Sequence, residues 1–137
     1  MEISFSLPHV FSSSSSSLED AYVLRVLLDA LVKVNLGYIR THRPANLYSS
    51  GVRYGRTKVW EPIPALYARR FGDCKSLSAV RIAELTLGGV QAQPVFRWMR
   101  RPDGGKDFHI LVLTAAGYED PSRKLGMGSN EVAKFSE

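Results

Sequence analysis

Residues 71–89, which read FGDCKSLSAVRIAELTLGG, decide the fold. Apolar side chains recur at helical spacing from Cys74 to about Leu87. Asp73 or Gly72 can cap the start of this helix, and the closing glycine pair can stop it. The stretch therefore predicts a helix that begins at the only cysteine of the chain.

Three strands are predicted after this helix. Two apolar runs, residues 90–99 and 108–113, flank the turn-forming sequence Pro-Asp-Gly-Gly at 102–105. They should therefore pair as an antiparallel hairpin. A third short run, residues 118–120, follows another turn and is stopped by Pro121.

A long helix is predicted near the N-terminus. Residues 18–36 are apolar apart from one charged stripe, which indicates a mostly buried helix. Ser17 and Asp20 stand at the spacing of a weak capping box, and Gly37 can end the helix. The serine run before it, residues 12–17, cannot bury apolar surface and is typical of a flexible tether.

The remaining segments carry little periodicity. Residues 38–72 hold many prolines and glycines, which predicts an irregular segment with a short helix around residues 65–70. We expect a flexible segment over residues 1–17, a single domain over residues 18–127 and a loose tail over residues 128–137.

The composition of the chain excludes several classes of protein and of site. The 137 residues are 45% apolar and 23% charged, which excludes disorder and a coiled coil for most of the chain. A single cysteine excludes an intrachain disulfide and a zinc site built on cysteine pairs. No run is long enough to span a membrane and none resembles a signal peptide, so we expect a cytoplasm-like compartment.

The positive charge has no single focus. Eighteen Lys and Arg against thirteen Asp and Glu give a net charge of +5, which favours acidic partners only mildly. Arg97, Arg100 and Arg101 resemble a nucleic-acid patch together with Trp98, but strand alternation splits them between two faces. A solvated hairpin is the preferred interpretation, and we do not expect a nucleic-acid partner.

Three residues stand in an order that could carry chemistry. Cys74 begins a helix, where unpaired N–H groups and the helix dipole favour the thiolate. His109 could exchange a proton with that thiol, and Asp120 could orient the imidazole. Glu119 is the alternative third member, although neighbouring residues on a strand point to opposite faces.

Each of the three also has an ordinary structural interpretation. A lone cysteine is often a small buried hydrophobe, a histidine in an apolar strand is often a hydrogen-bonded core residue, and an aspartate before proline is often a turn former. The three make only a thin mixed ligand set, so no metal site is expected. Spacing alone leaves the catalytic and the structural interpretations open.

The residues around these positions resemble a known superfamily. Residues 70–77 (RFGDCKSL), 107–110 (DFHI) and 118–123 (YEDPSR) resemble the transglutaminase-like cysteine peptidases. The Gly-Asp-Cys motif and the ending Glu-Asp-Pro-Ser-Arg-x-Leu-Gly-Met look like the short single-domain members encoded by tailed bacteriophages and prophages. Residues 49–54 (SSGVRY) and 60–64 (WEPIP) also resemble that group.

The resemblance covers roughly residues 47–127 and implies a papain-like α+β core. In such a core the nucleophile helix packs on a small antiparallel sheet, here preceded by the long N-terminal helix. The resemblance implies a catalytic triad with Cys74 as nucleophile, His109 as base and acid, and Asp120 as orienting carboxylate. The family's reactions are acyl transfers through a thioester and need no metal or organic cofactor.

The resemblance leaves details of the site open. Lys75 stands where the crosslinking enzymes carry an aromatic residue, which favours hydrolysis over crosslinking. Tyr54 and Trp60 are candidates for a side-chain oxyanion donor, and Asp73 is a further candidate for the cleft. The backbone N–H of Cys74 is the preferred donor.

Three functions follow, in order of preference. The first is a phage-type cysteine hydrolase, a peptidase or amidase acting on amide or isopeptide bonds of a protein or peptide. The second is a catalytically vestigial virion, assembly or protein-binding module that docks phage structural proteins or a second copy through the helix at residues 18–36. The third is a peptidoglycan peptide amidase, against which the absence of a signal segment weighs. The expected location is the host cytoplasm or the virion, with no membrane partner.

Overall fold

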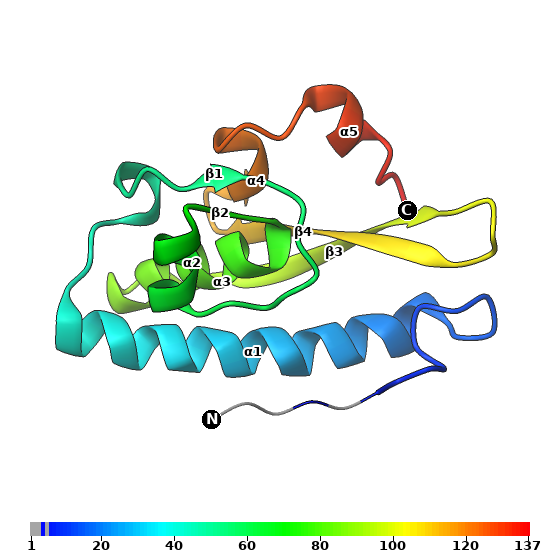
Figure 1. Cartoon of the computed structure of the whole chain (residues 1–137), viewed down its shortest axis with the longest axis horizontal. Helices are drawn as coiled ribbons and strands as arrows, with labels where there is room; N and C mark the ends of the chain where they lie inside the picture. Colours follow the sequence, from blue (N-terminus) through cyan, green and yellow to red (C-terminus); the bar gives the residue numbers. More distant parts are fainter. Residues whose placement is uncertain (1–3, 5) are drawn as a thin grey trace.

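A long helix lies along one side of a layer of shorter helices and strands (Figure 1). The computed structural model describes residue 4 and residues 6–137. The mixed α+β class with a long N-terminal helix is confirmed. The elements are, in chain order, α1 (Ser17–His42), the 3-10 helix η1 (Leu47–Ser49), β1 (Arg53–Tyr54), α2 (Ile63–Arg69), β2 (Phe71–Gly72), α3 (Cys74–Leu87), β3 (Gln93–Arg100), β4 (Lys106–Thr114), β5 (Gly117–Glu119), α4 (Pro121–Lys124) and α5 (Ser129–Ala133).

The start of α1 is capped one residue earlier than the sequence predicts. The Ser16 hydroxyl accepts a hydrogen bond from the Glu19 N–H at 3.1 Å, and the Ser16 N–H donates to the Glu19 carboxylate at 3.4 Å. The two bonds form a complete capping box. The predicted pair, Ser17 with Asp20, is wrong because the Asp20 side chain is held in a buried ion pair with Lys106.

The end of α1 lies beyond Gly37, so the predicted stop is also wrong. The helix continues to His42 and ends where Arg43 adopts a left-handed φ of 46°. A glycine inside a helix costs only about 1 kcal/mol relative to alanine, so packing can override it. Asn35, close to the glycine, is fully buried and accepts a hydrogen bond from the Ile63 N–H at 3.0 Å.

The central helix, α3, has the bounds that the sequence predicts. Every residue from Cys74 to Val80 is buried because α3 lies between α1 and β4. Fully burying a large apolar side chain contributes roughly 1.5–3 kcal/mol. One apolar cluster joins α1, α3 and β4 and contains Leu28, Leu31, Val32, Cys74, Ala79, Ile82, Ala83, Ile110 and Val112. A second lies on the α2 side of α3 and contains Leu47, Val52, Ile63, Leu66, Leu77, Val80 and Leu125.

The predicted hairpin is confirmed. Strands β3, β4 and β5 form one antiparallel sheet in that order. Their bounds differ from the predicted ranges by one to three residues. The register pairs Arg97 with His109 and Val112 with Glu119, which places the candidate base in the middle strand of the sheet.

A second, two-stranded sheet was not expected from the sequence. Strand β1 pairs in parallel with β2, with Tyr54 opposite Gly72. Two-residue strands are too short to give a hydrophobic alternation, which explains why the sequence predicts only an irregular segment with a short helix. The short helix itself is present as α2. The pairing brings Tyr54 beside the residues that lead into α3.

A buried ion pair joins α1 to the hairpin. The side chains of Lys106 and Asp20 are in contact and both fully buried. The ammonium also donates to the Ser15 carbonyl at 2.7 Å and lies 5.9 Å from the centre of the Trp98 ring. Burial raises the pKa of Asp20, but the Lys106 hydrogen bond and the Phe11 N–H outweigh it, and the net direction is down. The carboxylate therefore stays charged opposite its partner.

The segment before α1 contacts the hairpin. The sequence predicts a flexible tether over residues 1–17, part of which lies outside the described residues. In the described part, the Phe11 ring centre lies 6.2 Å from that of Trp98 and 5.6 Å from that of Phe108. The Phe11 carbonyl also accepts a hydrogen bond from the Lys106 N–H at 3.1 Å. This segment therefore packs against β3 and β4.

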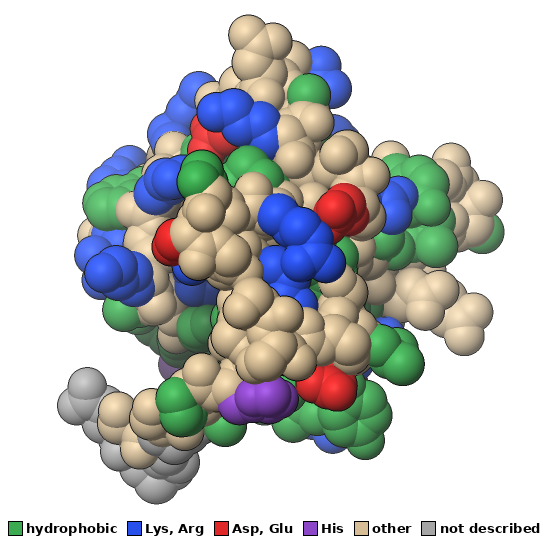
Figure 2. All heavy atoms as spheres, turned by 90° about the vertical axis from the view of Figure 1, so that its right-hand side faces the viewer, with side chains coloured by type: hydrophobic (Ala, Val, Ile, Leu, Met, Phe, Trp, Pro, Cys, Tyr) green, Lys and Arg blue, Asp and Glu red, His purple; other side chains and the backbone are tan. Residues whose placement is uncertain are grey.

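The surface carries its positive charge in several groups. Figure 2 looks onto the end of the molecule that holds the hairpin turn, and the Lys and Arg side chains lie there in separate patches rather than in one stripe. Over residue 4 and residues 6–137, no helix is both long and apolar enough to cross a membrane.

Removing one partner of the Asp20–Lys106 pair should destabilise the fold strongly. Asp20→Asn leaves the Lys106 ammonium buried without a counter-charge, so the free energy of unfolding should fall by about 3–5 kcal/mol. Replacing both partners, by Asp20→Leu with Lys106→Met, should recover most of the loss. Urea unfolding followed by circular dichroism measures the free energy of unfolding of the wild type, of Asp20→Asn and of the double variant.

The matched control is Asp29→Asn, which breaks the exposed pair between Arg25 and Asp29 on the same helix. It should cost no more than about 1 kcal/mol. Equal losses for Asp20→Asn and Asp29→Asn would show that burial of the ion pair does not matter to the fold.

Candidate active site

Cys74 is the first residue of α3 and is buried, with 6% of its surface exposed. Asp73 precedes it with the extended backbone of an N-cap residue, although its side chain makes no capping hydrogen bond. The thiol therefore lies at the positive end of the helix dipole, beside the N–H groups of the first turn.

His109 and Asp120 form a hydrogen-bonded pair. His109 Nε2 lies 2.9 Å from Asp120 Oδ2, and His109 is only 2% exposed. The other oxygen of Asp120 accepts a hydrogen bond from the Arg123 N–H at 3.1 Å and so caps α4. In the neutral ring this arrangement places the proton on Nε2 and leaves Nδ1 as the proton acceptor.

Glu119, the alternative third member, is engaged elsewhere. Its Oε2 accepts hydrogen bonds from the Tyr48 hydroxyl and from Arg81 Nε, both at 2.5 Å. Arg81 also lies 5.1 Å from the centre of the Tyr48 ring. Glu119 thus ties β5 to α3 and η1, and the carboxylate that reaches His109 is that of Asp120.

Cys74 and His109 line the same cavity, which has a volume of about 660 Å³. Asp120 is not among the described residues that line this cavity, and it lines a second, smaller hollow with Tyr118, Glu119, Arg123 and Lys124. The lining residues of the main cavity are Val10, Phe11, Tyr54, Arg56, Thr57, Lys58, Asp73, Cys74, Lys75, Arg101, Lys106, Asp107, Phe108, His109, Met127 and Phe135. Cys74 and His109 therefore lie on one cavity, and Asp120 contacts His109 from outside it.

The candidates for oxyanion donor and cleft residue are placed differently. Tyr54 and Asp73 line the cavity, whereas Trp60 is not among the described lining residues. The Trp60 ring centre lies 6.3 Å from that of Phe108. Burial raises the pKa of Tyr54 to about 12, so its hydroxyl stays protonated at neutral pH. That hydroxyl donates to Glu131 Oε1 at 3.1 Å.

Lys75 makes a contact that the sequence did not indicate. Its Nζ lies 2.5 Å from Asp73 Oδ2 and donates to the Thr57 carbonyl at 2.8 Å, and its side chain is almost fully buried. Burial raises the pKa of Asp73, and the Lys75 ammonium opposes that rise. The two charges flank Cys74 in sequence and form an ion pair at the floor of the cavity. The only sequence feature that could have indicated this ion pair was a lysine in the first turn of α3.

The thiol is not biased toward the thiolate in this arrangement, contrary to the expectation from its place at a helix start. Burial raises the pKa of Cys74 to about 12, and the Asp73 charge acts in the same direction. A hydrogen bond from the Ile110 backbone and the Lys75 charge act against it. Because desolvation is the largest of these effects, the thiol is protonated in this arrangement.

Two aromatic residues at the cavity were not predicted from the sequence. Phe11 comes from the segment expected to be a tether, and Phe135 comes from the tail expected to be loose. The Phe135 ring centre lies 5.5 Å from that of His109. For Phe135 the available signal was an isolated aromatic residue within an otherwise small and polar segment.

Among residue 4 and residues 6–137, no group of three or more His, Cys, Asp or Glu side chains is arranged to hold a metal ion. Comparison with known proteins gives no relatives: no family model, curated protein or solved structure matches this chain.

The buried thiol should make stability fall at high pH. At pH values below about 9, the ordinary pKa of the thiol, Cys74 is protonated in both the folded and the unfolded chain. Above it, the unfolded chain loses the proton while the folded chain keeps it up to about pH 12, so the unfolded state gains stability. The free energy of unfolding of the wild type minus that of Cys74→Ala should therefore decrease as the pH rises above 9.

Urea unfolding of both chains at steps from about pH 8 to about pH 10.5 measures this difference. Subtracting the Cys74→Ala value removes the contribution of the buried tyrosines, whose pKa values are also raised. A difference that stays constant or increases would show that the thiol is not held in its neutral form.

Proposed function

We propose that this chain is a phage-type, transglutaminase-like cysteine hydrolase that cleaves amide or isopeptide bonds through a thioester on Cys74. The observation that carries the proposal is the cavity shared by Cys74 and His109, with Asp120 hydrogen-bonded to the imidazole at 2.9 Å. The packing of α3 against β4 also supports a papain-like core.

The first half of the reaction forms the thioester. His109 Nδ1 accepts the proton of the Cys74 thiol, and the sulfur attacks the carbonyl carbon of the substrate. The oxyanion of the tetrahedral intermediate faces the N–H groups at the start of α3. The C–N bond then breaks, and His109 returns the proton to the departing amine.

The second half restores the enzyme. A water molecule gives a proton to His109 as its oxygen attacks the thioester carbonyl. The C–S bond breaks, the thiolate takes the proton back from the imidazolium, and a carboxylic acid leaves. Asp120 fixes the ring orientation and stabilises the imidazolium in both halves.

Hydrolysis is favoured over crosslinking by the surroundings of Lys75. In this chain the position after the nucleophile carries a buried ammonium held by Asp73 and Thr57, not the aromatic residue of the crosslinking enzymes. The site therefore lacks the feature that the resemblance associates with acyl transfer to a second amine.

A small activated ester tests the proposed chemistry without knowledge of the natural substrate. We expect p-nitrophenyl acetate to acetylate Cys74, and neutral hydroxylamine to remove the acetyl group because it is a thioester. Intact-mass measurement follows the acetylated chain. His109→Ala should slow acetylation by about 10²–10⁴-fold, the usual contribution of a general base.

The matched control is His42→Ala, which removes an exposed histidine on α1. It should leave the acetylation rate unchanged. Acetylation of Cys74 at equal rates in the wild type and His109→Ala, or an adduct that hydroxylamine does not remove, would rule the proposal out.

A second candidate function is assembly through α1. Leu18, Tyr22, Val26 and Val34 lie on one ridge of this helix and are exposed, Leu18 by 82% and Tyr22 by 75%. The occupant that fits is a second copy in antiparallel orientation. Glu19 and Lys33 lie at equal distances in sequence on either side of Val26, so each would face the other across a two-fold axis.

Sedimentation velocity over a range of concentrations tests this second candidate. We expect a dimer that Val26→Asp converts to monomer, because the substitution buries a charge at the centre of the ridge. Lys58→Asp, which puts the same charge on the rim of the cavity, should leave the dimer intact. A wild-type chain that is monomeric at every concentration excludes assembly through α1.

A further inference from the structure

Residues 128–137 form a segment that we call the C-terminal strap. It contains α5 and then returns to the β3–β4 hairpin (Figure 1). Helix α5 buries none of its own residues. The strap is therefore held by a small number of contacts, each of which falls on or beside the cavity.

The first contact is made by Glu131. Its Oε1 accepts hydrogen bonds from the Tyr54 hydroxyl at 3.1 Å and from Arg56 Nε at 3.3 Å. Both donors line the cavity. An acidic side chain is thus received by two donors at one end of the site.

The second contact is made by Phe135. Its ring centre lies 5.5 Å from that of His109, with the planes inclined by 36°. Phe135 is itself a lining residue of the cavity. The candidate base is therefore covered by an aromatic side chain of the strap.

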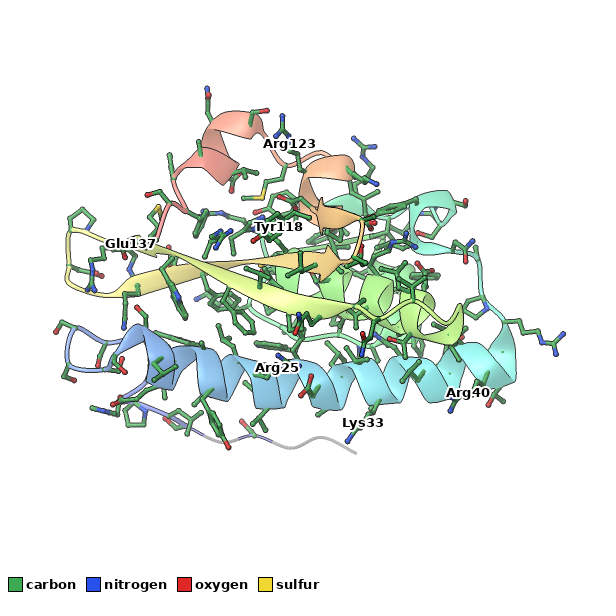
Figure 3. The ribbon with its side chains drawn as sticks, turned by 180° about the vertical axis from the view of Figure 1, so that it is seen from behind. Arg25, Lys33, Arg40, Tyr118, Arg123 and Glu137 are labelled. Atoms are coloured by element: carbon green, nitrogen blue, oxygen red, sulfur yellow. The ribbon has the colours of Figure 1, made fainter. Side chains whose placement is uncertain are left out.

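The third contact is made by Glu137, which lies beside the hairpin strands (Figure 3). Its N–H donates to the Trp98 carbonyl at 3.3 Å, and its carboxylate lies 3.6 Å from Arg100 Nε. The strap thus combines a backbone hydrogen bond to a strand with two acidic side chains on arginines, which is how a bound peptide is held.

These contacts are weak enough to break locally. The pair of Glu137 with Arg100 is exposed to solvent and that of Glu131 with Arg56 is partly exposed, and such pairs contribute little to stability. A segment with few buried contacts opens without unfolding the rest of the chain. Cys74 and His109 are nevertheless almost inaccessible while the strap is in place.

We propose that the C-terminal strap occupies the peptide-binding groove of this site in cis, and that the groove takes peptides carrying acidic residues around an aromatic one. A substrate peptide must displace the strap to reach Cys74. The identification of the groove rests on the proposed function, whereas the contact of Phe135 with His109 does not.

The charges around the cavity suit such a peptide. Arg56 and Arg100 receive the two acidic side chains of the strap, and Lys58 adds a positive charge among the lining residues. Arg101 also lines the cavity, but its charge is paired with Asp103 and Asp107. The cavity that holds the Phe135 ring also has apolar lining residues, among them Phe108 and Met127. An acidic peptide with one aromatic side chain reproduces each of these contacts.

Alkylation of the single cysteine measures the opening of the strap. Phe135→Ala in the full chain should raise the rate of Cys74 alkylation by iodoacetamide about tenfold, equivalent to about 1.4 kcal/mol in the opening equilibrium. The gain should be larger with the bulkier pyrenyl maleimide. Glu131→Gln should raise both rates by a smaller factor, because it loosens the strap without touching His109.

The matched control within the strap is Lys134→Ala, an exposed residue whose substitution should leave both rates within about twofold of the wild type. Circular dichroism of each variant establishes that it is folded. Unchanged alkylation in both Phe135→Ala and Glu131→Gln would overturn the proposal.

A second experiment tests the groove directly. The peptide SNEVAKFSE, which has the sequence of residues 129–137, should slow alkylation of Phe135→Ala in a saturable way. A segment attached in cis has an effective concentration on the order of millimolar, so the peptide is added up to about that level. The control peptide SNQVAKASE, which lacks the first acid and the aromatic, should have no effect. Equal slowing by both peptides, or by neither, would overturn the proposal.

His109→Ala separates the strap from the catalytic proposal. The gain from Glu131→Gln should persist in the His109→Ala background, because Glu131 holds the strap through Tyr54 and Arg56 and not through the imidazole. If that gain disappears there, the imidazole and not the strap controls access to the thiol, and the strap proposal fails. If the gain persists but His109→Ala leaves acetylation by p-nitrophenyl acetate unchanged, the strap stands and the proposed hydrolase does not.

Discussion

The enclosure of the first two turns of α3 is the constraint on which the other elements depend. Residues 74–80 are all buried, so α1 must cover them on one side and β4 on the other. This packing gives Cys74 a fixed position beside the strand that carries His109. It also removes water from the thiol, and the loss of solvation outweighs the helix dipole that favours the anion. The packing that fixes the position of Cys74 therefore also disfavours ionisation of its thiol.

The two ends of the described chain complete the cavity that the central elements begin. Phe11 and Phe135 come from opposite ends and both line it, while the proposed reacting groups come from α3, β4 and the start of α4. The central elements are held by apolar clusters and the segment before α1 by hydrogen bonds to Asp20 and Lys106, whereas the C-terminal segment is held by an aromatic contact and charges that are at least partly exposed. The proposed catalytic residues therefore lie on stably packed elements, whereas the C-terminal segment beside the cavity is held more weakly.

The parts of the fold that the sequence predicted are those with long, regular patterns. Helix α3 and the hairpin were predicted because their periodicity and glycine signals span many residues. The end of α1 was not, because burial around Asn35 overrides Gly37, and no local pattern records burial by a distant segment. The three proposed catalytic residues were named from motifs, but the Lys75 ion pair and the ring of Phe135 depend on contacts between segments far apart. Asp120 was chosen over Glu119 from the motif, whereas the engagement of Glu119 by Tyr48 and Arg81 could be seen only in the structure.

Asp120 uses its two oxygens for different purposes: one holds His109 and the other caps α4. A substitution at Asp120 therefore changes both the contact with His109 and the cap of α4. Asparagine and serine, which also cap helices well, would change the charge beside the imidazole. The aspartate is therefore required only while the negative charge beside the imidazole matters. If that charge were no longer needed, the cap alone would remain under selection, and asparagine or serine could replace the aspartate.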